Sequence, residues 1–115
     1  MGTDKKTISI TRDNNEALQR LVVDGQFNSE LDAAKFAMAH AIKKGTTPGR
    51  IDSADTKWNV GSVDIDGKLR SLLTAFYPDV DEPFRLMEYL MNKGLSDLAG
   101  SATQKLDVYG IIFDE

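Results

Sequence analysis

The sequence predicts a mainly α-helical fold with short strands. Residues 5–12 alternate apolar and polar side chains, with Ile8 and Ile10 on one face, which is the period-two pattern of a half-buried strand. Two amphipathic helical patterns follow within residues 13–45, and further helical patterns extend to residue 94. We expect an N-terminal strand-helix-helix core, followed by a C-terminal helical appendage that ends in a strand.

The N-terminal strand cannot be stable alone, because its backbone donors and acceptors need partners and two isoleucines bury little surface. No second strand pattern follows nearby in the sequence. The strand is therefore expected to pair with the same strand of a second copy, which predicts an intertwined homodimer.

The first helix is expected over residues 13–23, with Asp13 as the N-cap and Gly25 just beyond its end. The second is expected over residues 29–44, with Asn28 and Ser29 at its start and Gly45 after it. Five alanines in this helix give it high helix propensity and a wide apolar band. A band this wide predicts contacts with more than one neighbouring element.

A Thr-Thr-Pro-Gly run at residues 46–49 is the clearest boundary in the chain. It divides the chain into an N-terminal region at 1–45, a linker at 46–62 that docks through Trp58, and an appendage at 63–115. Helices are expected over 64–77 and from Pro83 to a C′ glycine at Gly94. Residues 106–113 predict a terminal strand whose apolar face would hold Tyr109, Ile111 and Phe113.

Composition excludes several classes of site. The 115-residue chain has no cysteine and one histidine, which excludes disulfides, cysteine zinc sites and thiol nucleophiles. No residue pattern indicates catalysis, so we expect no enzyme activity, no cofactor and no metal. No membrane helix or signal peptide is expected, which favours a cytoplasmic protein. The net charge is −4; residues 1–50 carry eight Lys and Arg against six acids, and the remainder carries six against twelve.

Residues 5–45 resemble the ribbon-helix-helix family of DNA-binding regulators. The resemblance rests on the alternating strand, the helix, the turn Gly25-Gln26-Phe27-Asn28-Ser29 and the alanine-rich helix. It implies that paired strands of two chains form a ribbon that enters the major groove, where each base pair shows a distinct pattern of donors and acceptors. By this resemblance the base-contacting residues are Thr7, Ser9 and Thr11, on the face opposite the isoleucines.

The same resemblance implies contacts to DNA phosphates from Lys5, Lys6 and Arg12, and from the N-terminus of the second helix at Asn28 and Ser29. The chain departs from the family pattern because no Arg, Asn or Gln lies on the outward strand face. In addition, Glu30 and Asp32 would repel a phosphate at the helix N-terminus.

Two functions follow as hypotheses. The first is a non-enzymatic, homodimeric DNA-binding transcriptional regulator, either a repressor or an antitoxin-like autoregulator. The alternative is a small acidic dimeric adaptor that binds a protein partner through its C-terminal half and does not bind DNA.

Weaker patterns favour structural roles. Ser62, Asp64 and Asp66 match the start of a calcium loop, but its twelfth position falls on Leu73, where a glutamate is required. This predicts a turn and a helix cap. His40 is expected to be a partly exposed histidine, with a pH-sensitive contact at a dimer interface as the alternative. The aromatic residues of the C-terminal half are expected in the core, with a partner-binding surface as the alternative.

Overall fold

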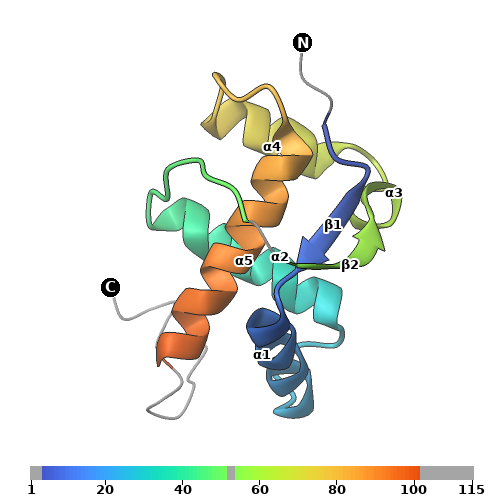
Figure 1. Ribbon diagram of the computed structural model, residues 1–115, viewed down its shortest axis with the longest axis vertical. Coiled ribbons are helices and arrows are strands. Elements are labelled where there is room, and N and C mark those ends of the chain that lie inside the picture. Colours follow the sequence, from blue (N-terminus) through green and yellow to red (C-terminus); the bar gives the residue numbers. More distant parts are fainter. Residues whose placement is uncertain (1–3, 52–53, 102–115) are drawn as a thin grey trace.

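The computed structural model describes residues 4–51 and 54–101. In chain order its elements are β1 (Thr7–Ile10), α1 (Arg12–Val23), α2 (Glu30–Lys43), β2 (Asp55–Asn59), α3 (Val60–Val63), α4 (Lys68–Phe76) and α5 (Pro83–Ser101). The expectation of a mainly α-helical fold with short strands is confirmed (Figure 1). The order strand-helix-helix therefore occurs twice along the chain, and the short helix α3 follows the second strand.

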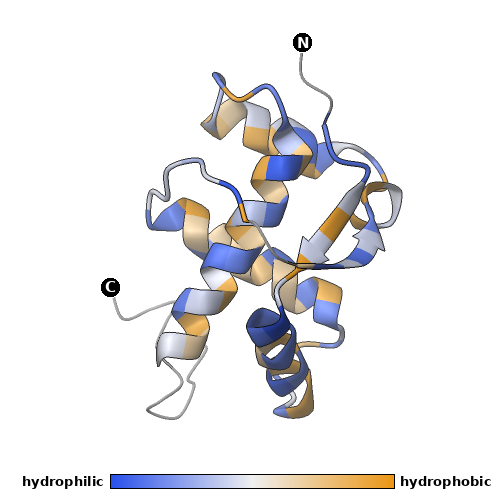
Figure 2. Ribbon diagram, in the orientation of Figure 1, coloured by the Kyte–Doolittle hydropathy of each residue, from blue (hydrophilic) through white to orange (hydrophobic). Residues whose placement is uncertain are grey.

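The partner of β1 lies in the same chain. β1 and β2 form an antiparallel two-stranded sheet in which Ile8 lies opposite Trp58 and Ser9 lies opposite Thr56. Lys57 is the extra residue of a bulge between these two pairs. From the sequence, this partner strand was expected to come from a second copy of the chain, and β2 was not predicted. Figure 2 shows the apolar and polar alternation along β1 that identified this strand.

Side chains of α5 bond the other edge of β1. Glu88 Oε2 accepts the Ser9 N–H at 2.8 Å, and Asn92 Oδ1 accepts the Thr11 N–H at 2.9 Å. The Asn92 amide also donates to the Ser9 carbonyl at 3.0 Å. Both α5 side chains are buried. Because buried backbone groups need partners, α5 here takes the place of a third strand. β1 therefore has partners on both edges within a single chain.

The two halves of the chain share one hydrophobic core. α5 packs against α1, α2 and β1, and α2 crosses it near the middle of the molecule (Figure 1). The core cluster includes residues on both sides of the 46–62 segment, among them Ile8, Leu18, Ala37, Met38, Leu73, Met87, Leu90 and Leu95. The appendage therefore packs on the N-terminal elements, a point that the sequence left open.

The crossing of α2 and α5 is very close at Gly94. A Cβ placed on Gly94 would overlap the backbone carbonyl of Ala37 in α2. The expectation that Gly94 ends its helix is wrong, since α5 continues to Ser101. The backbones of α2 and α5 approach too closely at this point for any side chain, so a glycine is required. The requirement comes from helix packing and not from the end of a helix.

Two helix starts differ from the predicted positions. α1 begins at Arg12, and its N-cap is Thr11, whose hydroxyl accepts the Asn14 N–H at 3.3 Å; the expected cap was Asp13. α4 begins at Lys68 instead of residue 64, because the Asp64 carboxylate accepts the N–H groups of Leu69 and Arg70 at 2.9 and 3.0 Å. The start of α2 is confirmed, with Ser29 accepting the Asp32 N–H at 3.1 Å.

The segment expected to be a linker is largely structured. Besides β2 and α3, its residue Thr46 accepts a hydrogen bond from the Tyr77 hydroxyl at 2.8 Å, and Trp58 packs against the core as expected. The predicted terminal strand at 106–113 lies outside the described residues. Within residues 4–51 and 54–101, no helix is both long and apolar enough to cross a membrane.

Candidate nucleic-acid interface

The two faces of the β1–β2 ribbon differ in chemistry. Residues that lie opposite each other in an antiparallel pair project on the same face. The inner face holds Ile8, which is fully buried, together with the partly buried Trp58. The outer face pairs Thr7 with Asn59 and Ser9 with Thr56. All four outer residues are polar and uncharged, so this face offers hydrogen-bond donors and acceptors without a net charge.

The three predicted base-contact residues are not equally accessible. Thr7 is half-buried. The expectation that Ser9 faces solvent is wrong, because only 6% of Ser9 is exposed where Glu88 and Asn92 reach its backbone. Thr11 is half-buried and uses its hydroxyl to cap α1. Thr7 is thus the one predicted base contact that is partly exposed and has no other structural role in the described contacts.

Two exposed residues on the outer face come from β2. Thr56 and Asn59 are both exposed, and Asn59 makes no capping hydrogen bond although it precedes α3. Sequence reasoning missed both because β2 carries a single large apolar residue and gives no alternating pattern. The need of β1 for a partner strand was the one indication of β2 in the sequence, because an isolated strand leaves its backbone groups unpaired. An Asn side chain matters here because its amide can pair with adenine at two positions.

The two predicted phosphate contacts that precede β1, Lys5 and Lys6, differ in whether they are already engaged within the protein. Lys6 is exposed, directly before the ribbon. Lys5 instead pairs with the buried Glu88 carboxylate, with Nζ 3.0 Å from Oε2. A lysine that neutralises a buried acid cannot move to a phosphate without leaving that acid unpaired, which is costly. Lys6 is therefore the better placed of the two for contact with DNA.

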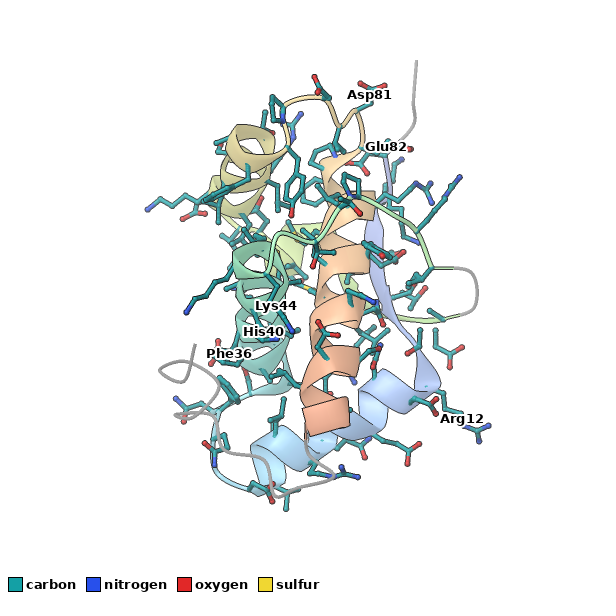
Figure 3. All side chains as sticks on the ribbon, turned by 90° about the vertical axis from the view of Figure 1, so that its left-hand side faces the viewer. Arg12, Phe36, His40, Lys44, Asp81 and Glu82 are labelled. Carbon is teal, nitrogen blue, oxygen red and sulfur yellow. The ribbon has the colours of Figure 1, made fainter. Side chains whose placement is uncertain are left out.

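Arg12 lies at the opposite end of the ribbon from Lys6. Its side chain is exposed and points away from the body of the protein (Figure 3). It lines a cavity of about 450 Å³ together with Asn15, Thr56, Lys57, Asp55 and Ile10. Lys57 donates to Asn15 Oδ1 at 2.6 Å and also pairs with Glu30, so Arg12 is the freer cation of this cavity.

The N-terminus of α2 is only partly suited to a phosphate. Asn28 and Ser29 are exposed there, as expected, and the Ser29 hydroxyl caps the Asp32 amide. The predicted repulsion from Glu30 is reduced, because its carboxylate is paired with Lys57 of β2. Asp32 remains exposed in the first turn. At the start of α5 the equivalent amides are occupied, since the Asp4 carboxylate accepts the Phe84 and Arg85 N–H groups at 2.8 and 3.0 Å.

The weaker sequence patterns have structural explanations. The expected turn is present, with Asp66 accepting the Lys68 N–H at 3.1 Å. The N-cap position of α4 is Gly67, and the Asp64 carboxylate accepts the N–H groups of Leu69 and Arg70 from three residues upstream. The described residues hold no group of three or more His, Cys, Asp or Glu placed to bind a metal. His40 is half-buried on α2 (Figure 3). Burial lowers the pKa of its imidazole, Lys44 lowers it further, and Asp97 opposes the shift.

The function of the chain has to be inferred from its own residues. No family model matches the sequence, and no curated protein or solved structure matches it significantly.

Proposed function

We propose that this protein is a DNA-binding transcriptional regulator that reads the major groove with the β1–β2 ribbon. The observation that carries the proposal is the asymmetry of the ribbon. Ile8 and Trp58 anchor its inner face to the core, while Thr7, Thr56 and Asn59 leave its outer face polar and accessible. The resemblance of residues 5–45 to ribbon-helix-helix regulators supports the same function.

The dimensions of a two-stranded ribbon suit this role. The major groove is about 12 Å wide and admits such a ribbon, whose outward side chains then reach the base edges. In the proposed mode one chain supplies both strands, where the family resemblance implied two chains. A homodimer would carry two ribbons and would select a repeated half-site.

Charges at both ends of the ribbon would position it on the duplex. Lys6 precedes β1 and Arg12 follows it, and both are exposed. Phosphate contacts of this kind fix register without reading sequence, whereas the outer-face hydroxyl and amide groups would supply the sequence preference. Since few cations are available and the net charge is −4, we expect a modest affinity that falls as salt concentration rises.

Selection from a random duplex-DNA pool at two salt concentrations tests the proposal, with oligomeric state measured by light scattering. The wild-type protein is expected to enrich a defined sequence at low salt. The double variant Thr56→Ala/Asn59→Ala is expected to lose about tenfold or more of its preference for that sequence, since one good base contact contributes roughly 1–3 kcal/mol. Its salt dependence should stay unchanged, because neither residue carries charge.

Thr47→Ala is the matched control, because Thr47 is also exposed but lies outside the ribbon. It should enrich the wild-type sequence. A folded wild-type protein that enriches nothing at low salt would exclude sequence-selective DNA binding and leave the adaptor function as the better proposal.

One observation favours the adaptor as a second candidate. The α4 region exposes three large apolar side chains: Ile65 is 86% exposed, Phe76 59% and Leu72 42%. Leu72 and Phe76 lie one turn apart on α4, whereas Ile65 lies in the turn before the helix. Figure 2 shows apolar residues along α4. A cluster of exposed apolar residues is typical of a protein-binding surface. In this second proposal the surface formed by Ile65, Leu72 and Phe76 would bind a second copy of the chain and so form the dimer of the adaptor.

Substitution of this surface should affect association and leave folding intact. Ile65→Ser/Phe76→Ser is expected to change the free energy of unfolding by no more than about 0.5 kcal/mol per site, because both side chains are largely in solvent. Leu73→Ala, on the buried side of the same helix, should cost about 2–5 kcal/mol. Urea denaturation measures both effects.

Sedimentation of the double variant then tests the second candidate. A dimer that becomes monomeric on Ile65→Ser/Phe76→Ser would support association through α4. An unchanged dimer, or a wild-type protein that is already monomeric at high concentration, would argue against it.

A further inference from the structure

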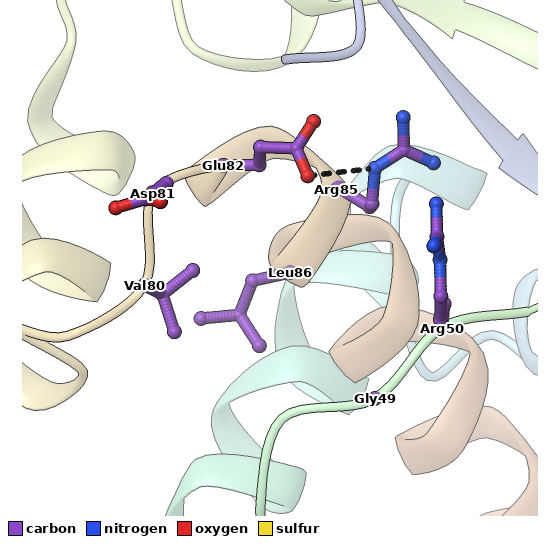
Figure 4. A pocket seen from close by; sticks show the side chains of 7 residues that line it. All are labelled: Gly49, Arg50, Val80, Asp81, Glu82, Arg85 and Leu86. Atoms are coloured by element: carbon purple, nitrogen blue, oxygen red, sulfur yellow. Dashed lines mark ion pairs between the residues drawn. The ribbon is translucent and has the colours of Figure 1, made fainter. Parts of the chain in front are cut away.

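We propose that a pocket between residues 49–50 and the first turns of α5 binds a phosphate group through Arg50 and Arg85. The pocket has a volume of about 250 Å³ and is lined by Gly49, Arg50, Val80, Asp81, Glu82, Arg85 and Leu86 (Figure 4). The identity of the ligand as a DNA phosphate rests on the proposed DNA-binding function. The affinity of the pocket for phosphate can be measured independently of that function.

The two guanidinium groups have few acceptors. Arg85 Nε is buried and has no hydrogen-bond partner among residues 4–51 and 54–101. Glu82 Oε1 lies 3.3 Å away as an ion pair, but the N–H is not aligned with it. Arg50 is exposed and makes no hydrogen bond or ion pair within the described residues. An arginine presents five N–H donors in a planar fork that suits phosphate oxygens. The pocket therefore offers many more donors than the protein satisfies.

The carboxylates of the pocket leave its cationic side open. In Figure 4 the Arg50 side chain points toward Arg85, whereas the Asp81 carboxylate points away from both arginines. Glu82 approaches Arg85 from one side only, through Nε. A tetrahedral oxyanion between the two guanidinium groups would accept charge-assisted hydrogen bonds from both, and these are stronger than bonds between neutral groups.

The pocket lies beside the segment that leads into the ribbon. Asp4 bonds the amides of Phe84 and Arg85, and Lys5 pairs with Glu88 one turn further along α5. Arg85 is thus held next to residues 4–5, close to the end of the ribbon where Thr7 begins. Arg12 lies at the other end. On the proposed function, a DNA bound to the ribbon would place a backbone phosphate in the Arg50–Arg85 pocket.

The first experiment uses inorganic phosphate alone. NMR titration of the full chain, with chloride at matched ionic strength as the reference, is expected to shift the Arg50 and Arg85 side-chain signals saturably. Arg50→Gln should weaken phosphate binding about tenfold. Because Arg50 is exposed, this variant keeps its fold even if Arg85→Gln does not. Arg20→Gln, an exposed arginine on α1, is the control and should bind phosphate like the wild type.

The second experiment distinguishes the source of the phosphate. If the wild type binds duplex DNA, Arg50→Gln should lower the slope of log affinity against log salt by about one and leave the selected sequence unchanged. A normal slope would mean that the pocket takes free phosphate and no DNA phosphate. If the protein binds no DNA but its phosphate binding depends on Arg50, the phosphate pocket is supported and the proposed DNA-binding function is excluded. Absence of saturable phosphate binding, or equal binding by Arg50→Gln, overturns the pocket.

Discussion

Gly94→Ala is expected to destabilise the protein by about 2 kcal/mol or more. The added Cβ would overlap the Ala37 carbonyl, which belongs to the backbone of α2 and cannot rotate away as a side chain could. The two central helices would have to separate, and overpacking of this kind typically costs about 1–3 kcal/mol and sometimes more. Alanine favours a helix by up to about 1 kcal/mol relative to glycine, and this gain is smaller than the cost of separation.

Gly100→Ala is the matched control, because Gly100 lies in the same helix and a Cβ there would meet nothing within 4 Å. Urea denaturation should show a loss of stability for Gly94→Ala and no loss for Gly100→Ala, which is expected to be neutral or slightly stabilising. Equal stabilities for the two variants would show that α2 and α5 do not cross closely at Gly94.

Asn92→Leu is expected to cost roughly 3 kcal/mol or more. The Asn92 amide accepts from the Thr11 N–H and donates to the Ser9 carbonyl, and it also accepts from Asn14 Nδ2 at 3.0 Å. Leucine has a similar volume but no polar side-chain atoms, so the Thr11 N–H and the Ser9 carbonyl would lose their partners, while Asn14 Nδ2 would keep its bond to the backbone carbonyl of residue 92 at 3.0 Å. A buried polar group left unsatisfied costs about 1–3 kcal/mol.

Hydrogen exchange gives this prediction a local readout. In the wild type the Ser9 and Thr11 amides should be protected, although neither bonds to β2. Asn92→Leu should accelerate the exchange of Thr11 more than that of Ser9, because Glu88 still accepts the Ser9 N–H. Ser96→Ala serves as the control; Ser96 is exposed, and within the described residues its hydroxyl donates to Asn14 Oδ1 at 3.1 Å and to no other group. Unchanged Thr11 exchange in Asn92→Leu would contradict the bonding of β1 by α5.

The same contacts bear on how copies of the chain could associate. Pairing through β1 would require a second chain to displace either β2 or the side chains of α5. The outer edge of β2 carries no strand among the described residues. An association through strand pairing would therefore use β2, whereas the second candidate function would use α4. Cross-linking at Thr56 and at Phe76 would separate these two modes.

Local chemistry made the first part of the fold predictable. The alternation around Ile8 and Ile10 defined β1, and the Ser29 cap together with the alanine-rich pattern defined α2. These features depend on residues within a few positions of one another, so the sequence alone contains them. For the same reason it predicted the end of α4 before Pro78 and the start of α5 at Pro83.

Contacts between distant residues decided what the sequence could not. Ser9 and Glu88 are 79 positions apart, and their hydrogen bond buries a residue that alternation places on the outer face. β2 has little strand pattern of its own and forms because β1 needs a partner, which brings Thr56 and Asn59 to the candidate interface. The sequence by itself thus determined which segments form the first strand and most of the helices. The tertiary structure decided which edges and side chains remain exposed, because burial depends on what packs against a residue as well as on its neighbours in the chain.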